Sequence, residues 1–224
     1  MSFTNFGKIA ESKNQVIRLT HVATGTSVSF AAFLTEFSDD YQVSWGTEQI
    51  FGRNDPIKPY QSTTRSISIA FQVLAPSFEA ARENLQKYST LTKMLYPVYS
   101  APIGANPNSR TIKGPPLIRI KFVNFIQAAS GEGSLLGCIE GFKFAPVQDA
   151  GYFVEQNGDL FPKHFDVSFR FTPQHESPLG WDSQTERFLT DAFPYSSAPS
   201  QIEANEPSGT NSSKQQAKND RALD

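Results

Sequence analysis

The sequence predicts a mainly β protein, in which antiparallel strands pack on one shared core and a single helix lies at their flank. Apolar and polar residues alternate along several stretches, which is the pattern of strands with one dry face and one wet face. One other stretch has apolar residues three and four positions apart, which is the spacing of an amphipathic helix. Together these patterns favour an antiparallel β-sandwich or a partial barrel with one flanking α-helix.

The alternation places strands along most of the chain. Residues 15–37 are predicted to hold two strands around a turn at residues 23–26. Further strands are expected at residues 65–73, 117–125, 136–147, 152–154 and 163–172. The clearest alternation is the inward set Ile67, Ile69, Phe71 and Val73, repeated by Phe165, Val167, Phe169 and Phe171. Strands of this kind expose one face of a sheet to water and bury the other.

The helix is expected near residues 77–94. Its apolar stripe consists of Phe78, Ala81, Leu85, Tyr88 and Leu91. Ser77 is a suitable N-cap, and Glu79 lies in the first turn, where the helix dipole favours an anion. Pro97 marks the end of the helix.

Two segments lack a strand or helix pattern. Residues 100–116 are rich in Pro, Gly and Asn and are predicted to form a long loop. Residues 194–224 contain too few apolar residues to offset the entropy of ordering them, so we expect a disordered or partner-bound tail. Residues 1–193 are then a single domain.

Composition excludes several classes of protein. The formal net charge is −2, which argues against a basic surface wrapped around nucleic acid. The single cysteine, Cys138, excludes an internal disulfide framework. No secretory signal is found, and no apolar run approaches the ~18 residues that a membrane helix needs, so we expect a soluble protein made in a cytoplasm.

The sequence shows no set of catalytic or metal-binding residues. The three histidines, His21, His164 and His175, do not have the spacing of a metal-binding motif. Asp39 and Asp40 are adjacent, so on a strand they would point to opposite faces, and a solvent-exposed turn is the preferred interpretation. We therefore expect neither an enzyme nor a cofactor.

The segment from Trp45 to Phe71 combines charged and aromatic residues and is the main candidate for a functional site. Asn54 and Asp55 favour a turn, and Asp55 could hold Arg53 or Arg65 in a charge-assisted pair. Trp, Tyr and Arg are also the preferred anchors of protein interfaces. The candidate residues for an assembly loop or an internal clasp are Trp45, Phe51, Arg53, Asp55, Tyr60 and Arg65.

The same segment resembles a group of tail baseplate proteins from contractile-tailed bacteriophages, hub or tube-initiator proteins. The resemblance begins with the run W-G-x-E-x-I-F-G-R-x-D-P-I-x-x-Y-x-x-T-x-R-x-I-x-I-x-F. It continues in "SFEAARENLQKYSTL" with "LYPVY", in "GPPLIRIKFVNFI" with "LLGCIEGFKFAP", and in "GDLFPKHFDVSFRFTPQHESPLGW". The order and spacing agree from Trp45 to Trp181, which is well over half of the chain.

This resemblance implies a tail-tube type of fold and a structural role in the virion. Proteins of this kind form rings, generally hexameric, at the junction of baseplate hub and tail tube, with other baseplate and tube proteins as partners. They assemble in the host cytoplasm, contact no membrane, and leave a channel through which DNA passes. Residues expected to face such a channel are Arg119, Lys121, Asp166 and Arg170. The alternative is a monomeric β-sandwich that binds a small ligand or glycan beside Trp45 and Tyr60.

Overall fold

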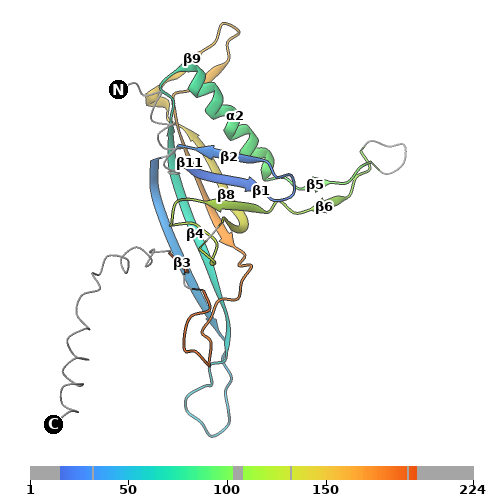
Figure 1. Cartoon of the computed structure of the whole chain (residues 1–224), viewed down its shortest axis with the longest axis vertical. Coiled ribbons are helices and arrows are strands. Elements are labelled where there is room, and N and C mark those ends of the chain that lie inside the picture. The colour runs from blue at the N-terminus through green and yellow to red at the C-terminus, as the bar shows by residue number, and fades with distance from the viewer. Residues whose placement is uncertain (1–15, 32, 103–107, 132, 191, 196–224) are drawn as a thin grey trace, which may run out of the picture.

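The structure, a computed structural model, describes residues 16–31, 33–102, 108–131, 133–190 and 192–195. Its elements are β1 (Ile17–His21), β2 (Ser27–Phe30), β3 (Phe33–Trp45), β4 (Tyr60–Leu74), α2 (Phe78–Met94), β5 (Val98–Tyr99), β6 (Ile112–Gly114), β7 (Ile118–Lys121), β8 (Leu135–Pro146), a short 3-10 helix (Gln148–Ala150), β9 (Tyr152–Val154), β10 (Leu160–Pro162) and β11 (His164–Pro173). Figure 1 shows these elements on the whole chain.

Seven of the strands form one antiparallel sheet. Their order across the sheet is β2-β1-β7-β8-β11-β4-β3, and β5–β6 and β9–β10 make two separate two-stranded ribbons. Every pairing is antiparallel. The predicted mainly β fold, with antiparallel sheets and one α-helix in the described residues, is confirmed.

The seven-stranded sheet bends at β8, so that its two halves enclose one core. The first residues of β8 pair with β7, and the rest of β8 pairs with β11 through a register shift. Gly141 lies near this shift with a φ of 61°, a conformation that glycine adopts without strain. As a result Phe30 on the edge strand β2 contacts Phe71 on β4, with ring centroids 5.8 Å apart. The sheet therefore curls into a partial barrel.

Gly137 permits this close approach of β8 to β11. A Cβ atom at this position would lie 2.3 Å from the backbone oxygen of Thr172 and 2.6 Å from the Phe171 ring. Such contacts are far inside van der Waals distance, so only glycine fits between the two strands.

The core consists of the alternating residues that the sequence places on the dry faces. The fully buried large side chains of β4 and β11 include Ile67, Phe71, Phe165 and Phe171. Leu91 and Met94 at the end of α2 pack on the same cluster. The ring of Tyr88, from the middle of the helix, stacks on Phe144 with centroids 4.1 Å apart.

The helix begins and ends as predicted. The Ser77 side chain accepts a hydrogen bond from the Ala80 backbone N–H, and Glu79 lies in the first turn. The first turn also carries Phe78, which packs against Phe161 of β10 with ring centroids 5.2 Å apart. This contact fixes the β9–β10 ribbon to the helix.

Two predictions need correction or fall partly outside the described residues. Residues 100–116 are not entirely loop, because Ile112–Gly114 form β6 and pair with β5. The predicted tail starts later than expected, since the Tyr195 hydroxyl bonds to Asp39 on the body of the protein. The rest of that tail, 196–224, lies outside the described residues. In the described part, no helix is both long and apolar enough to cross a membrane.

Candidate assembly surfaces

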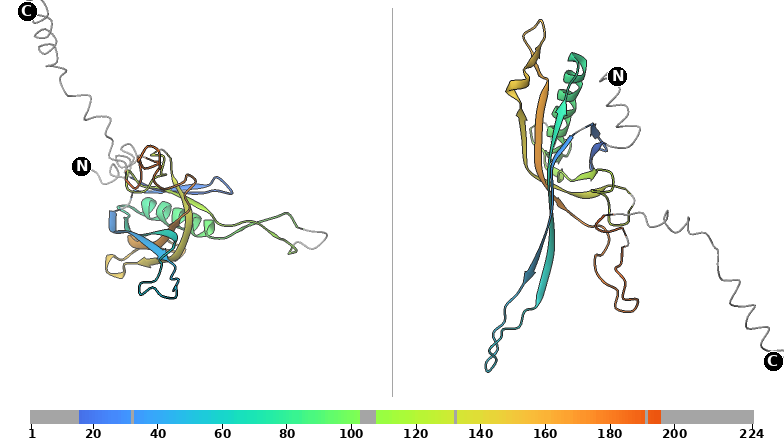
Figure 2. Two further views of the ribbon diagram at one scale, coloured as in Figure 1. Left: turned by 90° about the horizontal axis from the view of Figure 1, so that it is seen from below. Right: turned by 90° about the vertical axis from the view of Figure 1, so that its left-hand side faces the viewer.

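Strands β3 and β4 extend beyond the core as one long hairpin. Figures 1 and 2 show it leaving the body at one end of the molecule. Its cross-strand pairs run from Tyr41↔Arg65 to Trp45↔Tyr60, and the Glu48↔Ile57 bridge continues the pairing toward the tip. From Asp40 to Trp45, every residue of β3 is exposed.

One face of this hairpin carries an apolar strip. Because side chains alternate along a strand, Tyr41, Val43 and Trp45 continue the dry face of the sheet into solvent. Trp45 is 55% exposed and packs edge to face on Tyr60, and Phe51 at the tip is fully exposed. The apolar strip consists of Tyr41, Val43, Trp45 and Tyr60. Exposed apolar surface that continues a core face is typical of a contact site for another protein.

A buried ion pair lies at the base of the hairpin. Arg65 donates from Nε to Asp39 Oδ1 at 2.8 Å and from Nη2 to Asp39 Oδ2 at 2.6 Å. Both side chains are only 4% exposed. The bidentate geometry matches the planar guanidinium to the carboxylate, which is the strongest form of such a pair.

Phe193 and Tyr195, near the end of the described chain, cover this ion pair. The Phe193 ring lies 5.3 Å from the Arg65 guanidinium carbon on one side, and the Tyr41 ring lies 5.4 Å from it on another. The Tyr195 hydroxyl donates to Asp39 Oδ2 at 2.8 Å. These contacts tie the end of the described chain to the base of the hairpin.

The surroundings of the pair shift the pKa of its members. Burial pushes the pKa of Asp39 upward, but the hydrogen bonds from Arg65 and Tyr195 and the Arg65 charge outweigh burial and lower it. Burial acts to lower the pKa of Arg65, yet the bonded Asp39 carboxylate raises it. Both groups are therefore charged at neutral pH. Burial is also the main cause of the raised pKa of Tyr41.

The sequence analysis expected Asp55 to pair with Arg53 or Arg65, and this prediction is wrong in its acidic residue. Arg65 pairs with Asp39, and Asp55 has no ion pair or side-chain hydrogen bond among the described residues. Asp39 and Asp40 lie within β3 rather than in a turn, with Asp39 inward and Asp40 exposed. Sequence reasoning missed this pair because Asp39 faces Arg65 only in the β3–β4 register, which the sequence alone does not show. The remaining candidates Trp45, Phe51, Arg53 and Tyr60 lie on the projecting part of the hairpin.

His175 lies beside the same cluster and has no hydrogen-bond partner among the described residues. Both of its ring nitrogens are buried, and its ring packs edge to face on Phe193 at 5.6 Å. Burial, and then the Arg65 charge, lower the pKa of His175, although Asp39 acts in the opposite direction. The imidazole is therefore neutral at pH 7.

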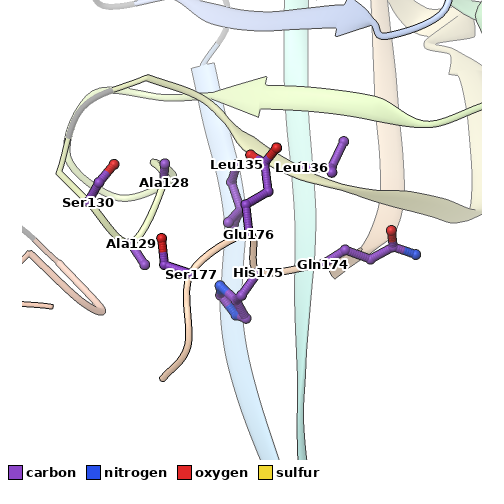
Figure 3. Close-up of a pocket in the computed structure, with 9 residues that line it drawn as sticks. All are labelled: Ala128, Ala129, Ser130, Leu135, Leu136, Gln174, His175, Glu176 and Ser177. Atoms are coloured by element: carbon purple, nitrogen blue, oxygen red, sulfur yellow. The ribbon is translucent and has the colours of Figure 1, made fainter. Parts of the chain in front are cut away.

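A small cavity of about 60 Å³ adjoins His175 (Figure 3). It is lined by Ala128, Ala129, Ser130, Leu135, Leu136, Gln174, His175, Glu176 and Ser177. Ligand pockets usually measure ~300–1,000 Å³, so this cavity can hold water but not a sugar or nucleotide.

The polar face of the sheet lies opposite the core. We use this name for the outward residues of β3, β4, β8 and β11, which include Glu36, Asp40, Ser66, Ser68, Glu140, Lys143, Asp166, Ser168 and Arg170. A broad open hollow on this face lies among Glu36, Glu140 and Arg170. Four carboxylates and two cations belong to the face, so its charge is mixed with an acidic excess.

The predicted channel residues divide between the two halves of the sheet. Asp166 and Arg170 lie on the polar face, on β11. Arg119 and Lys121 lie on β7, on the other side of the bend. Arg119 is engaged by Glu176 through two hydrogen bonds of 2.6 and 2.7 Å. The structure therefore brings only two of the four candidates together.

The sheet has two edge strands at its ends, β2 and β3. In the described part of the chain, β3 pairs with β4 on one side only, and residues 34–45 form a long edge on its other side. Unpaired backbone groups on an edge of this length are a template for another strand. Among the described residues, no group of three or more His, Cys, Asp or Glu side chains is placed to hold a metal ion.

Comparisons with known proteins include a distant structural likeness. No protein-family model matches the chain, and no curated protein matches its sequence. A similar solved structure is a chain from the tail of an empty gene transfer agent (GTA) particle with C6 symmetry. Sequence identity is 11% and the TM-score is 0.32, and the match covers 74% of this chain and 97% of the other. This likeness is too distant to assign a function.

Proposed function

We propose that this protein is a structural subunit of a phage tail baseplate. In this role it forms a ring at the junction of the hub and the tail tube, templates the tube and leaves a channel for DNA. The observation that carries the proposal is the β3–β4 hairpin, which exposes an apolar strip and, as far as the described residues go, a strand edge with no neighbouring strand on the same element. The resemblance of residues 45–181 to baseplate proteins supports the same role.

The proposed mechanism is geometric rather than chemical. The edge of β3 over residues 34–45 is completed by a neighbouring copy, whose backbone pairs with it. The apolar strip is buried in the same contact, with Trp45 and Tyr60 as aromatic anchors. The surface that covers β3 lies elsewhere on the neighbour, so the contact repeats head to tail and closes into a ring, six copies in the proteins that this chain resembles.

The polar face is the proposed lining of the channel. Its acidic excess repels DNA phosphates, while Lys143 and Arg170 keep the repulsion moderate. DNA then passes without binding. Because Asp166 and Arg170 share this face, we retain them as channel residues and place Arg119 and Lys121 outside it.

The experiment is electron microscopy of negatively stained protein, together with light scattering after size exclusion. Wild-type protein is expected to form rings at high concentration, and Val43→Asp with Trp45→Ser is expected to prevent them. Both side chains are about half exposed, so the melting temperature should change little. Gln42→Asp, on the opposite face of the same strand, is the matched control and should still assemble.

A monomer at every concentration that binds a small ligand or glycan would refute the proposal in favour of the alternative. That alternative placed a pocket beside Trp45 and Tyr60. Neither of the two hollows described above includes these residues, which lie on the projecting hairpin.

A further inference from the structure

Two short ribbons each expose an apolar pair of residues that face each other across the strands. In β5–β6 the pair is Tyr99↔Ile112, 51% and 65% exposed. In β9–β10 it is Val154↔Leu160, 67% and 56% exposed. Figure 1 shows β5–β6 extending sideways from the body, and β9–β10 at the end opposite the tip of the long hairpin. The two ribbons therefore present their apolar pairs on different sides of the molecule.

The β9–β10 ribbon is a firmly anchored platform. Its inward residues Phe153 and Phe161 pack edge to face on Phe78 of the helix, at 6.4 and 5.2 Å between ring centroids. Its turn is closed by a backbone hydrogen bond of 2.9 Å from Glu155 N–H to the Asp159 carbonyl. Since alternate residues of a strand face opposite ways, this anchoring holds Val154 and Leu160 outward.

The two ribbons carry opposite charge. Arg110 and Lys113 are exposed on the β5–β6 side, and the sequence has no acidic residue between Glu83 and Glu132. We call β5–β6 with its exposed residues 99 and 110–113 the basic arm. The turn of β9–β10 carries Glu155 and Asp159, and we call residues 152–162 the acidic hairpin. The two apolar pairs can bury each other, and the opposite charges beside them attract, so the two ribbons are complementary surfaces.

We propose that the basic arm of one copy docks on the acidic hairpin of the next copy in the assembly. The Tyr99–Ile112 pair covers the Val154–Leu160 pair, and Arg110 and Lys113 approach Glu155 and Asp159. The inference rests on the proposed function in one respect, that the partner is a second copy of this chain. Because the two surfaces differ, the contact is head to tail and can repeat around a ring.

This contact supplements the proposed contact between copies at the β3 edge. Two apolar pairs bury much less than the ~1,000 Å² that a stable interface needs alone. Its role is to fix the register between neighbouring copies and to speed their association, since charge complementarity acts mainly on specificity and on-rate.

Charge reversal tests the docking in the full chain. Arg110→Glu with Lys113→Glu makes both surfaces acidic, and Glu155→Lys with Asp159→Lys makes both basic. Each double variant is expected to raise the protein concentration needed for half-assembly at least tenfold. Mixing the two double variants should restore assembly, because each arm then meets a hairpin of opposite charge. Arg82→Glu with Lys93→Glu, two exposed helix residues, is the control for net charge and should assemble like the wild type.

Disulfide cross-linking gives a second readout. In a Cys138→Ser background, Ile112→Cys with Leu160→Cys is expected to give a ladder of covalent oligomers on oxidation, whereas Ile112→Cys with Arg82→Cys is not. Rings that form without this ladder and tolerate both charge reversals would overturn the docking and leave the ring intact. A wild-type chain that never assembles would overturn the docking and the proposed function together.

Discussion

The Arg65–Asp39 pair offers the sharpest test of how the hairpin is held. In Asp39→Ala the guanidinium stays buried after losing both of its hydrogen bonds to carboxylate, at 2.8 and 2.6 Å. The Tyr195 hydroxyl loses its acceptor in the same substitution. Removing one member of a buried ion pair costs about 3–5 kcal/mol.

The lower end of that range is expected here. The rings of Tyr41 and Phe193 remain over the guanidinium, and such cation–π contacts contribute about 1–2 kcal/mol when water is excluded. We therefore expect Asp39→Ala to lower the free energy of unfolding by about 3 kcal/mol. For a domain of this size that corresponds to a fall in melting temperature of roughly 6–12 °C.

Urea unfolding followed by tryptophan fluorescence measures this change. Asp40→Ala, the exposed neighbour on the same strand, is the control and should change stability by no more than about 0.5 kcal/mol. Asp39→Ala combined with Arg65→Met should recover much of the loss, because neither charge then remains buried. A loss below about 1 kcal/mol in Asp39→Ala alone would refute the view that this pair holds the hairpin.

Three further predictions concern pH and packing. Because the pKa of Asp39 is lowered in the folded state, its stabilisation is present above the unfolded pKa of ~3.9 and is lost as pH falls through the folded value. Asp39→Ala should therefore make the free energy of unfolding, measured by urea titration at a series of pH values, fall less steeply at acid pH. His175 also has a lowered pKa, so below pH ~6.5 the unfolded chain binds a proton that the folded chain does not; His175→Leu should remove the stability loss that begins there, and an unchanged profile would contradict it. Gly137→Ala should lower the free energy of unfolding by about 1–3 kcal/mol or more, because its Cβ would overlap Thr172 and Phe171. Gly158→Ala, which has open space around it but a positive φ, is the control and should cost less. Equal melting temperatures for the two variants would contradict the close approach of β8 to β11.

Local patterns were sufficient to predict the helix and the main core strands, but not the outer part of β3, where Asp39 and Asp40 were expected in a turn. Alternation with a period of two depends only on neighbouring positions, so the inward set on β4 and β11 could be found without any pairing information. The cap at Ser77 was predictable for the same reason, since its hydrogen bond to Ala80 spans three residues. The Asp39–Arg65 pair spans 26 residues and depends on register, which alternation does not specify.

The bend of the sheet and the cover over the hairpin base could not be predicted from the sequence. The bend depends on a register shift in β8 and on the close fit of Gly137 against β11, both of which are properties of paired strands. The cover consists of Phe193 and Tyr195, which are isolated aromatics in a mostly polar stretch. Their importance arises from contacts with Arg65 and Asp39, distant in sequence.

The tie between Tyr195 and Asp39 has a consequence for the order of events during synthesis. The two residues are 156 positions apart, so the hairpin emerges from the ribosome long before its fastening does. Until then the Arg65–Asp39 pair at the base of the hairpin lacks its contacts with Phe193 and Tyr195. The base of the hairpin therefore reaches its final packing only after most of the chain has been translated, which makes this packing a late step in the folding of the domain.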